Sequence, residues 1–318
     1  MISLDAIESA RERIAGAAVR TPLVRLHVDA PAEIWLKLEN LQPIASFKIR
    51  GAANAVGGAD PAEVEAGLVT ASAGNMAQGV AWIARELGLP ATIVVPEQAP
   101  ESKLAAVGRL GGTVIRVPYA EWWRAIEESC VRGVDGLFVH PVVDERVMAG
   151  NGTIALEILE DLPEPAAVVV PYGGGGLVTG IASALRAVRP ATRVYAVEPE
   201  TGAALNAALA AGEPTKIDYQ PSFVDGAGSP SVLPDMFARV RELIDGAFTA
   251  SLDETAAAVR LLAERTRVVA EGAGALAPAA ALAGRAGEGP VVCVVSGGNI
   301  DLSTLGPILA GRVPQPPR

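Results

Sequence analysis

The sequence predicts an α/β protein of two domains, each an open, mostly parallel sheet covered by helices. Three observations carry this prediction. Half of the residues are hydrophobic and 19 % are charged, which is typical of a globular chain. At 318 residues the chain exceeds one typical core, so two domains are expected. From about residue 67, short apolar runs alternate with helical patterns, as in βαβ units.

The N-terminal part of the chain carries one helical pattern and one strand pattern. Apolar residues recur at helical spacing from Leu4 to Ile14, and Pro22 lies beyond the end of this helix. A strand is expected around Trp35, and a helix over residues 49–56 follows after a loop.

A regular alternation of strands and helices follows. The predicted strands are 68–71, 92–95, 113–117 and 137–139, and the helices after the first three end near residues 87, 107 and 132. Because these strands are short and apolar, we expect a parallel sheet with both faces covered. This segment is assigned to a smaller domain, residues 49–145.

The pattern then restarts and gives the larger domain, residues 1–48 and 146–318. Its expected strands are 167–171, 193–197 and 291–295, and its expected helices are 146–159, one ending near 188, 252–265 and 275–284. The stretch after Pro221 is less regular, and a loop is predicted at 225–228.

The charge balance and two rare residue types argue against several functions. The net charge is −10, from 26 basic and 36 acidic residues, which disfavours nucleic acid or an anionic membrane as a partner. With two histidines, a His-rich metal site or a Ser-His-Asp triad is not expected. Two cysteines make no disulfide framework, and no apolar run approaches the roughly 20 residues of a membrane span. We therefore expect a soluble, cytoplasmic protein that binds a small molecule.

Lys48 lies between Phe47 and Ile49 at the predicted junction of a loop and a helix. A lysine with apolar neighbours commonly lays its stem along the surface and extends its ammonium into water. Alternatively, desolvation lowers its pKa and makes it a nucleophile toward carbonyls. Such a lysine can hold pyridoxal phosphate (PLP) as a Schiff base.

Four consecutive glycines, Gly173–Gly176, follow a predicted strand and precede a helix. Their backbone N–H groups can converge at the helix N-terminus, which suits a phosphate group. A dinucleotide site is the alternative, because Glu198 lies near the place of a ribose-binding acid. However, Val178 or Thr179 occupies the last position of the G-x-G-x-x-G pattern. A single phosphate monoester fits better, and a purely steric turn is the remaining interpretation.

Two further polar segments follow predicted strands. The first is Ser72-Ala73-Gly74-Asn75, and the second begins at Ser296. Ligands of open α/β sheets bind at the carboxyl ends of strands. The first segment could receive a carboxylate or a phenolic oxygen, although a plain helix cap explains it as well. Ser296 is equally consistent with a turn.

Taken together, these segments resemble the fold-type II PLP-dependent enzymes. The matching segments are Ser46-Phe47-Lys48-Ile49-Arg50-Gly51, Ser72-Ala73-Gly74-Asn75, Pro171-Tyr172-Gly173-Gly174-Gly175-Gly176-Leu177 and Ser296-Gly297-Gly298-Asn299, with lesser matches at Ala149-Gly150-Asn151-Gly152-Thr153 and Glu271-Gly272-Ala273-Gly274-Ala275. Within that superfamily the chain looks most like the threonine/serine ammonia-lyases (dehydratases) and the related serine racemases. The resemblance covers nearly the whole chain and implies a tryptophan synthase β-like fold, PLP as cofactor and a homodimer.

The resemblance also implies a role for each matching residue. Lys48 would hold PLP and later remove the proton from Cα of the substrate. Phe47 would pack near the cofactor ring, Asn75 would hydrogen-bond its phenolic oxygen, and Ser296 would face its pyridine nitrogen. The phosphate would bind the backbone of Gly173, Gly174, Gly175, Gly176 and Leu177, and the substrate carboxylate would bind Ser72, Ala73, Gly74, Asn75 and Met76.

The neutral hydroxyl of Ser296 leaves the pyridine nitrogen unprotonated, which weakens the electron sink and favours prompt loss of a β-hydroxyl. The resemblance therefore implies dehydration and deamination of L-threonine or L-serine to a 2-oxo acid and ammonia. Alternatives are another 3-hydroxy amino acid such as 3-hydroxyaspartate, serine racemisation and β-replacement. A non-catalytic PLP-binding protein and a nicotinamide oxidoreductase are alternatives from other classes.

Three positions depart from the family pattern. The racemases place a serine where Ala73 stands, so racemisation is disfavoured. Met76 replaces the usual histidine, which leaves the selection of the substrate side chain open. Some relatives bind a divalent metal through acids after a Glu-Pro pair. Here Glu198 is followed by Gly202 and Ala204 at those positions, so we expect no metal.

Overall fold

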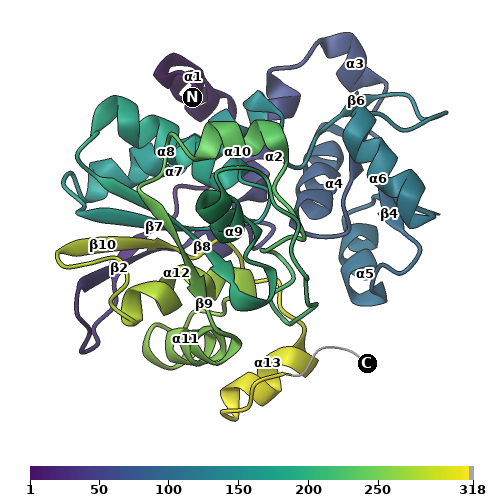
Figure 1. Ribbon diagram of the computed structural model, residues 1–318. Helices are drawn as coiled ribbons and strands as arrows, with labels where there is room; N and C mark the ends of the chain where they lie inside the picture. The colour runs from purple at the N-terminus through teal and green to yellow at the C-terminus, as the bar shows by residue number, and fades with distance from the viewer. Residues whose placement is uncertain (315–318) are drawn as a thin grey trace.

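Two sheets organise the computed structural model, which describes residues 1–314 (Figure 1). In spatial order, the larger sheet contains β1 (Leu23–Arg25), β2 (Glu33–Lys37), β10 (Pro290–Val294), β7 (Ala167–Pro171), β8 (Arg193–Pro199) and β9 (Gly246–Ala250). The smaller sheet contains β5 (Thr113–Val117), β4 (Ala91–Pro96), β3 (Leu68–Ala71) and β6 (Leu137–Phe138). β1 runs antiparallel to β2, and the other neighbouring strands are parallel. Both sheets thus confirm the predicted fold class.

Helices cover both faces of the larger sheet (Figure 1). One face carries α1 (Leu4–Arg13), α7 (Glu145–Asp161), α8 (Gly176–Val188), α9 (Ala204–Ala211) and α10 (Pro234–Val240). The other carries α11 (Leu252–Arg265), α12 (Gly272–Leu282) and α13 (Leu302–Leu309). The smaller sheet packs with α2 (Lys48–Gly57), α4 (Asn75–Leu87) and α5 (Glu101–Arg109), and α3 (Pro61–Glu65) and α6 (Tyr119–Glu128) lie in the same part of the chain. Two short 3-10 helices are Glu39–Leu41 and Glu200–Gly202.

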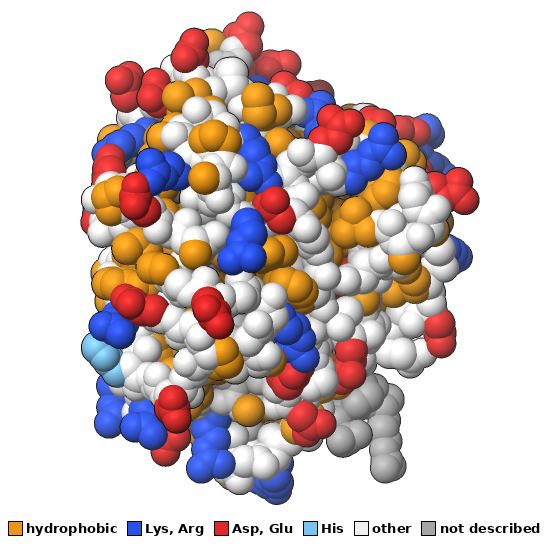
Figure 2. Space-filling view, turned by 60° about the vertical axis from the view of Figure 1, so that its left-hand side comes forward, with side chains coloured by type: hydrophobic (Ala, Val, Ile, Leu, Met, Phe, Trp, Pro, Cys, Tyr) orange, Lys and Arg blue, Asp and Glu red, His pale blue; other side chains and the backbone are white. Residues whose placement is uncertain are grey.

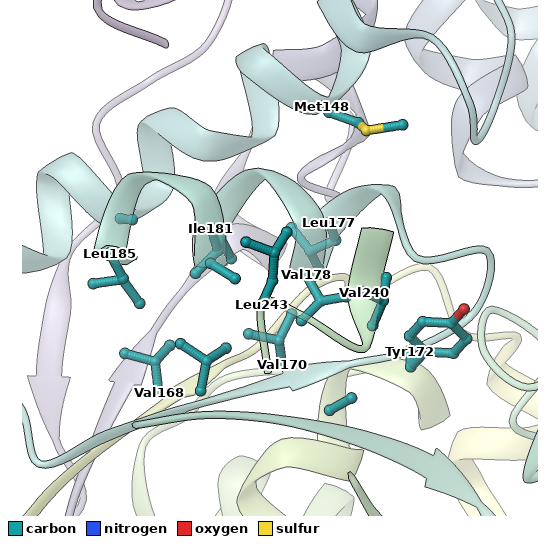
Figure 3. Close-up of a cluster of buried hydrophobic side chains, with 14 of the residues drawn as sticks. Met148, Val168, Val170, Tyr172, Leu177, Val178, Ile181, Leu185, Val240 and Leu243 are labelled. Atoms are coloured by element: carbon teal, nitrogen blue, oxygen red, sulfur yellow. The ribbon is translucent and has the colours of Figure 1, made fainter. Parts of the chain in front are cut away.

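Strand β7 shows why the larger sheet is buried on both sides. All of its residues are apolar and buried, and successive side chains point to opposite faces. Val168 and Val170 pack under α8, as Figure 3 shows, whereas Ala167 and Val169 pack against the α11–α12 side. This double burial explains why the strand reads as a continuous apolar run instead of an alternating one.

Helix α2 joins the two halves of the molecule. It packs against α7, next to the larger sheet, and against α4, next to the smaller sheet. Its first residue is Lys48, so this side chain begins where the two halves meet.

The structure also contains helices and strands that the sequence analysis did not predict: β1, β9, α3, α9, α10 and α13. The predicted bounds 113–117, 167–171 and 252–265 agree with the structure. The smaller sheet lies within the segment predicted as the smaller domain. Residues 315–318 of the predicted larger domain lie outside the described residues.

The surface carries interspersed charges. On the face shown in Figure 2, basic side chains lie among acidic and apolar ones and form no continuous basic surface. Within residues 1–314, the structure contains no helix of the length and apolarity that a bilayer crossing requires.

Candidate active site

Three of the predicted segments meet at one edge of the larger sheet. Because β2, β10 and β7 are parallel neighbours, the loops that follow them leave at the same edge. The Phe47 N–H donates to the Ser296 carbonyl over 3.0 Å, and Ser46 pairs with Gly297. A cavity at this edge is lined by Phe47, Lys48, Pro141, Pro171, Gly173, Gly174, Gly175, Gly176, Leu177, Gly226 and Ser296. The structure therefore brings together the lysine, the glycines and the serine that the sequence singled out.

Lys48 has the properties of a desolvated nucleophile. Its Nζ donates to the Pro141 carbonyl over 2.9 Å and lies 5.3 Å from the centre of the Phe47 ring. Desolvation lowers the pKa of the Lys48 ammonium from 10.5 to about 8. About a tenth of this amine is therefore neutral at pH 7, far more than in an ordinary lysine, and the neutral form is the one that attacks a carbonyl.

A buried charge cluster fixes the start of α2. Arg50 is fully buried, and its Nε lies 2.8 Å from Glu39 Oε2 while Nη1 lies 2.7 Å from Glu157 Oε1. Lys37 Nζ lies 2.5 Å from Glu157 Oε2. Two cations thus balance two carboxylates two residues from Lys48. The sequence analysis quoted Arg50 within the motif but assigned it no role, because its partners come from distant segments.

The tetraglycine loop is shaped to receive an anion. Gly175 has φ +94° and precedes α8, whose first N–H groups lie at the loop. A side chain at Gly174 would come within 2.7 Å of Val142 Cγ1, and one at Gly175 within 3.2 Å of the Tyr172 ring. Figure 3 shows Tyr172 at the end of β7. Close packing against Val142 and Tyr172 therefore leaves little room for a Cβ at these two positions.

His140 shapes the segment that covers this loop. Its Nδ1 accepts from the N–H groups of Val142 and Val143, each over 3.0 Å. Its Nε2 lies 3.1 Å from the carbonyl of Ile126 and therefore carries the proton. Burial lowers the pKa of His140, which agrees with a neutral ring. His140 thus holds the turn that presents the Pro141 carbonyl to Lys48.

The segment from Ser72 to Met76 forms the start of α4 at the carboxyl end of β3. The Gly74 N–H donates to Ser72 Oγ over 3.2 Å, and α4 begins at Asn75. The first N–H groups of a helix can receive a carboxylate. The Met76 side chain is buried in the core of the smaller sheet, so its backbone alone can face a ligand.

Asn75 is held by two residues of the larger half. Its Nδ2 donates to Glu271 Oε1 over 2.8 Å, and its Oδ1 accepts from Asn299 Nδ2 over 2.8 Å. Burial raises the pKa of the Glu271 carboxyl to about 8. The sequence analysis quoted the Glu271 segment as a lesser match and assigned Glu271 no role. Its position in that motif was the one feature of the sequence that could have marked it as a site residue.

Glu198 is engaged in backbone hydrogen bonds. Its carboxyl accepts from the N–H groups of Leu205 and Asn206 and from Asn206 Nδ2, each over 2.9 Å. Among residues 1–314, no group of three or more histidine, cysteine, aspartate or glutamate side chains is arranged to hold a metal.

A wider cleft between the two halves leads toward Glu271. The smaller half contributes Gln78, Lys103 and Arg109, and the larger half contributes residues that include Asp225 and Asn299. Lys103 Nζ lies 2.7 Å from Asp225 Oδ2, so one ion pair crosses this cleft.

The fold and this site define a PLP-dependent enzyme. The pyridoxal-phosphate dependent enzyme family matches residues 14–297, and the chain belongs to it. It is 39 % identical to L-threonine ammonia-lyase of Thermotoga maritima, over 97 % of this chain and 78 % of that protein. It is 38 % identical to the catabolic L-threonine dehydratase TdcB of Escherichia coli K12, over 96 % of each chain.

Solved structures of PLP-dependent enzymes have the same fold. A maize serine racemase superposes with a TM-score of 0.87 at 32 % identity, over 96 % of this chain and 95 % of that one. A T.th. threonine deaminase superposes with a TM-score of 0.85 at 36 % identity, over 94 % of this chain and 99 % of that one.

The residues present fit the cofactor of this family. A tetraglycine loop packed too tightly for a Cβ at Gly174, a helix N-terminus and a lysine of lowered pKa line one cavity. These groups match the phosphate and the aldehyde of PLP.

Proposed function

We propose that this enzyme dehydrates and deaminates a β-hydroxy amino acid, with L-threonine first and L-serine second, to a 2-oxo acid and ammonia. The observation that carries the proposal is Lys48, whose desolvated amine shares a cavity with the tetraglycine loop and Ser296. Relatives named for threonine ammonia-lyase or dehydratase activity, at 38–39 % identity over nearly the whole chain, support the substrate.

Residues of the cavity, together with Asn75 at the start of α4, would hold the cofactor. The N–H groups of Gly173, Gly174, Gly175, Gly176 and Leu177 would bind its phosphate, and Phe47 would pack beside its ring. Asn75 would donate to its phenolic oxygen, and the Ser296 hydroxyl would face its pyridine nitrogen. When bound, PLP supplies an aldehyde for the amino group and a sink for the electrons of the Cα–H bond.

Lys48 has two tasks in this proposal. Its neutral amine would hold the cofactor through the aldehyde, and the same amine would take the proton from Cα of the bound substrate. The lowered pKa suits both, because the amine must be unprotonated before each of them. The Pro141 carbonyl, held by the His140 turn, marks the position to which Nζ returns.

The start of α4 binds the substrate carboxylate. Ser72, Ala73, Gly74, Asn75 and Met76 surround the first N–H groups of this helix, and Met76 contributes only its backbone. Orientation by these donors aligns the Cα proton with Lys48.

One observation favours elimination over racemisation. Ala73 carries no ionisable proton, so this position offers no second base to deliver a proton to the opposite face of Cα. Serine racemisation is therefore less favoured.

The test is release of 2-oxo acid from the PLP-loaded enzyme with L-threonine, L-serine and 3-hydroxyaspartate in parallel. We expect 2-oxobutanoate from L-threonine at the highest kcat/KM. Formation of D-serine from L-serine without pyruvate would contradict the proposal. Consumption of sulfide in the same assay would instead indicate β-replacement.

We also propose a cytoplasmic homodimer and a two-domain division at 49–145. The unpaired cysteines Cys130 and Cys293 support a reducing compartment. Sedimentation of the purified protein tests the dimer, and structures with and without a substrate analogue test closure of residues 49–145 on the substrate carboxylate.

A further inference from the structure

A directional chain of hydrogen bonds runs through the site from Ile44 to Glu271. The Ile44 carbonyl accepts from Asn299 Nδ2 over 2.9 Å, and the same nitrogen donates to Asn75 Oδ1. Because a backbone carbonyl can only accept, the nitrogen of Asn299 must face it. The oxygen of Asn75 must then face Asn299.

Glu271 closes the other end of this chain. Its Oε1 accepts from Asn75 Nδ2 over 2.8 Å. A reversed Asn75 amide would place its nitrogen against the Asn299 donor, and it would lose the hydrogen bond that Asn75 Nδ2 donates to Glu271 Oε1. The Ile44 end therefore fixes which atom Asn75 turns to each side, and Glu271 Oε1 holds the Asn75 nitrogen in that orientation.

Glu271 is built into the wall of the site. It is 6 % exposed, and its backbone N–H donates to the Gly297 carbonyl over 3.0 Å. A Cβ at Gly297 would overlap Oε1, and one at Gly226 would lie 3.6 Å from it. Gly226 lines the cofactor cavity, whereas Glu271 lines the wider cleft. The carboxyl therefore stands between the two spaces.

We propose that Glu271 is a positioning residue that fixes the Asn75 amide so that its nitrogen faces the phenolic oxygen of the cofactor. Asn75 Nδ2 has two hydrogens, and Glu271 takes one, which leaves the second for the cofactor. This inference rests on the proposed function in taking Asn75 as a cofactor contact.

The charge of Glu271 adds a pH-dependent element. The groups that face it are Asn75, Asp225 and Lys103; burial and Asp225 raise its pKa, whereas Asn75 and Lys103 lower it. Below about pH 8 the carboxyl is neutral. Above that pH it places a negative charge near the phenolic oxygen, which disfavours a phenolate there.

The experiment measures PLP affinity of the cofactor-free protein by the visible absorption of the bound cofactor. We expect Glu271→Ala to weaken binding about tenfold, as loss of one well-placed hydrogen bond does. Glu271→Gln retains an acceptor and stays neutral. It should bind PLP like the unchanged protein at pH 7 and should lose less affinity above pH 8.

A double-mutant cycle separates positioning from packing. In the Asn75→Ala background, Glu271→Ala should cost no further affinity, because its effect passes through Asn75. Additive losses, or unchanged affinity in Glu271→Ala, would overturn the proposal. Glu198→Gln is the matched control: Glu198 is also buried but bonds to α9, so PLP affinity should hold even if the thermal midpoint falls.

The same measurements distinguish failure of the inference about Glu271 from failure of the proposed function. If Asn75→Ala itself leaves PLP affinity and absorption unchanged, the assignment of Asn75 fails. If Asn75→Ala weakens binding while Glu271→Ala does not, the inference about Glu271 alone fails.

Discussion

Lys37 and Lys48 are both desolvated lysines, but different groups hold them. Desolvation lowers the pKa of both ammonium groups. Lys37 Nζ lies 2.5 Å from Glu157 Oε2 and 2.6 Å from the Thr21 carbonyl, so an ion pair holds it. Lys48 Nζ has the Pro141 carbonyl at 2.9 Å. A desolvated lysine that is held by a neutral carbonyl, such as Lys48, is thus available for chemistry. A desolvated lysine that is paired with a carboxylate, such as Lys37, has a structural role.

The largest expected loss of activity follows from replacing Lys48. Lys48→Ala should lower 2-oxo acid release by about a thousandfold or more, because both the cofactor attachment and the base are lost. The assay uses saturating PLP and L-threonine. Lys37→Met should keep the cofactor attached while lowering the thermal midpoint, and equal loss of attachment in both variants would contradict the distinction.

Removing the second cation of the cluster that holds Lys37 should cost stability. Arg50→Met leaves Glu39 and Glu157 buried with Lys37 as the remaining cation of the cluster. We expect a loss of about 3–5 kcal/mol in the free energy of unfolding, measured in urea. Arg189→Met, which breaks an exposed pair with Glu164, is the control and should cost at most about 1 kcal/mol. Similar losses in the two variants would show that the cluster does not hold α2.

The strands around these lysines could be predicted from the sequence, because their burial leaves a local pattern. The run Ala167–Pro171 is apolar throughout, and its bounds were predicted as observed. Strand β9 was missed, since Gly246–Ala250 is short, at the edge of its sheet and mostly half-buried. Helix α10 and β9 both lie in the irregular stretch after Pro221.

Part of the candidate site could likewise be predicted from local sequence motifs, and part could not. Lys48, the tetraglycine loop and Ser296 were predicted because each follows a strand in a local motif, and the structure places them around one cavity. The contact between Asn75 and Glu271 joins residues 196 positions apart. Nothing local to either residue encodes it, so only the fold could reveal the chain of hydrogen bonds.

A substitution in the tetraglycine loop should have a smaller effect. Gly174→Ala places a methyl group against Val142, so the covering segment must shift, and PLP affinity should fall roughly ten- to hundredfold. Titration of the cofactor-free protein measures this. Gly306→Ala is the matched control, because a Cβ there meets no atom within 4 Å in α13. Unchanged PLP affinity in Gly174→Ala would show that the phosphate binds elsewhere.

The smallest expected effect is the pH dependence of cofactor capture. The folded pKa of Lys48, about 8, lies below its usual 10.5, so the unfolded chain binds more protons between these values. Lys48 therefore adds stability to the cofactor-free protein as pH rises through that window, compared with Lys48→Met.

The same neutral amine sets the rate of PLP attachment. The rate should rise by about tenfold between pH 7 and 9 and then level off, because the neutral fraction saturates. Stopped-flow absorption measures it, in the Glu271→Gln variant so that Glu271 does not titrate in the same range. A rise that continues to pH 10 would indicate an unperturbed lysine.

The most direct test of the account is chemical labelling of the lysine that holds the cofactor. The PLP-loaded protein is reduced with borohydride, digested and mapped by mass spectrometry. The account predicts a pyridoxyl group on Lys48 and none on Lys37. A label on Lys37, or a protein that gains no visible band and no label with added PLP, would contradict it.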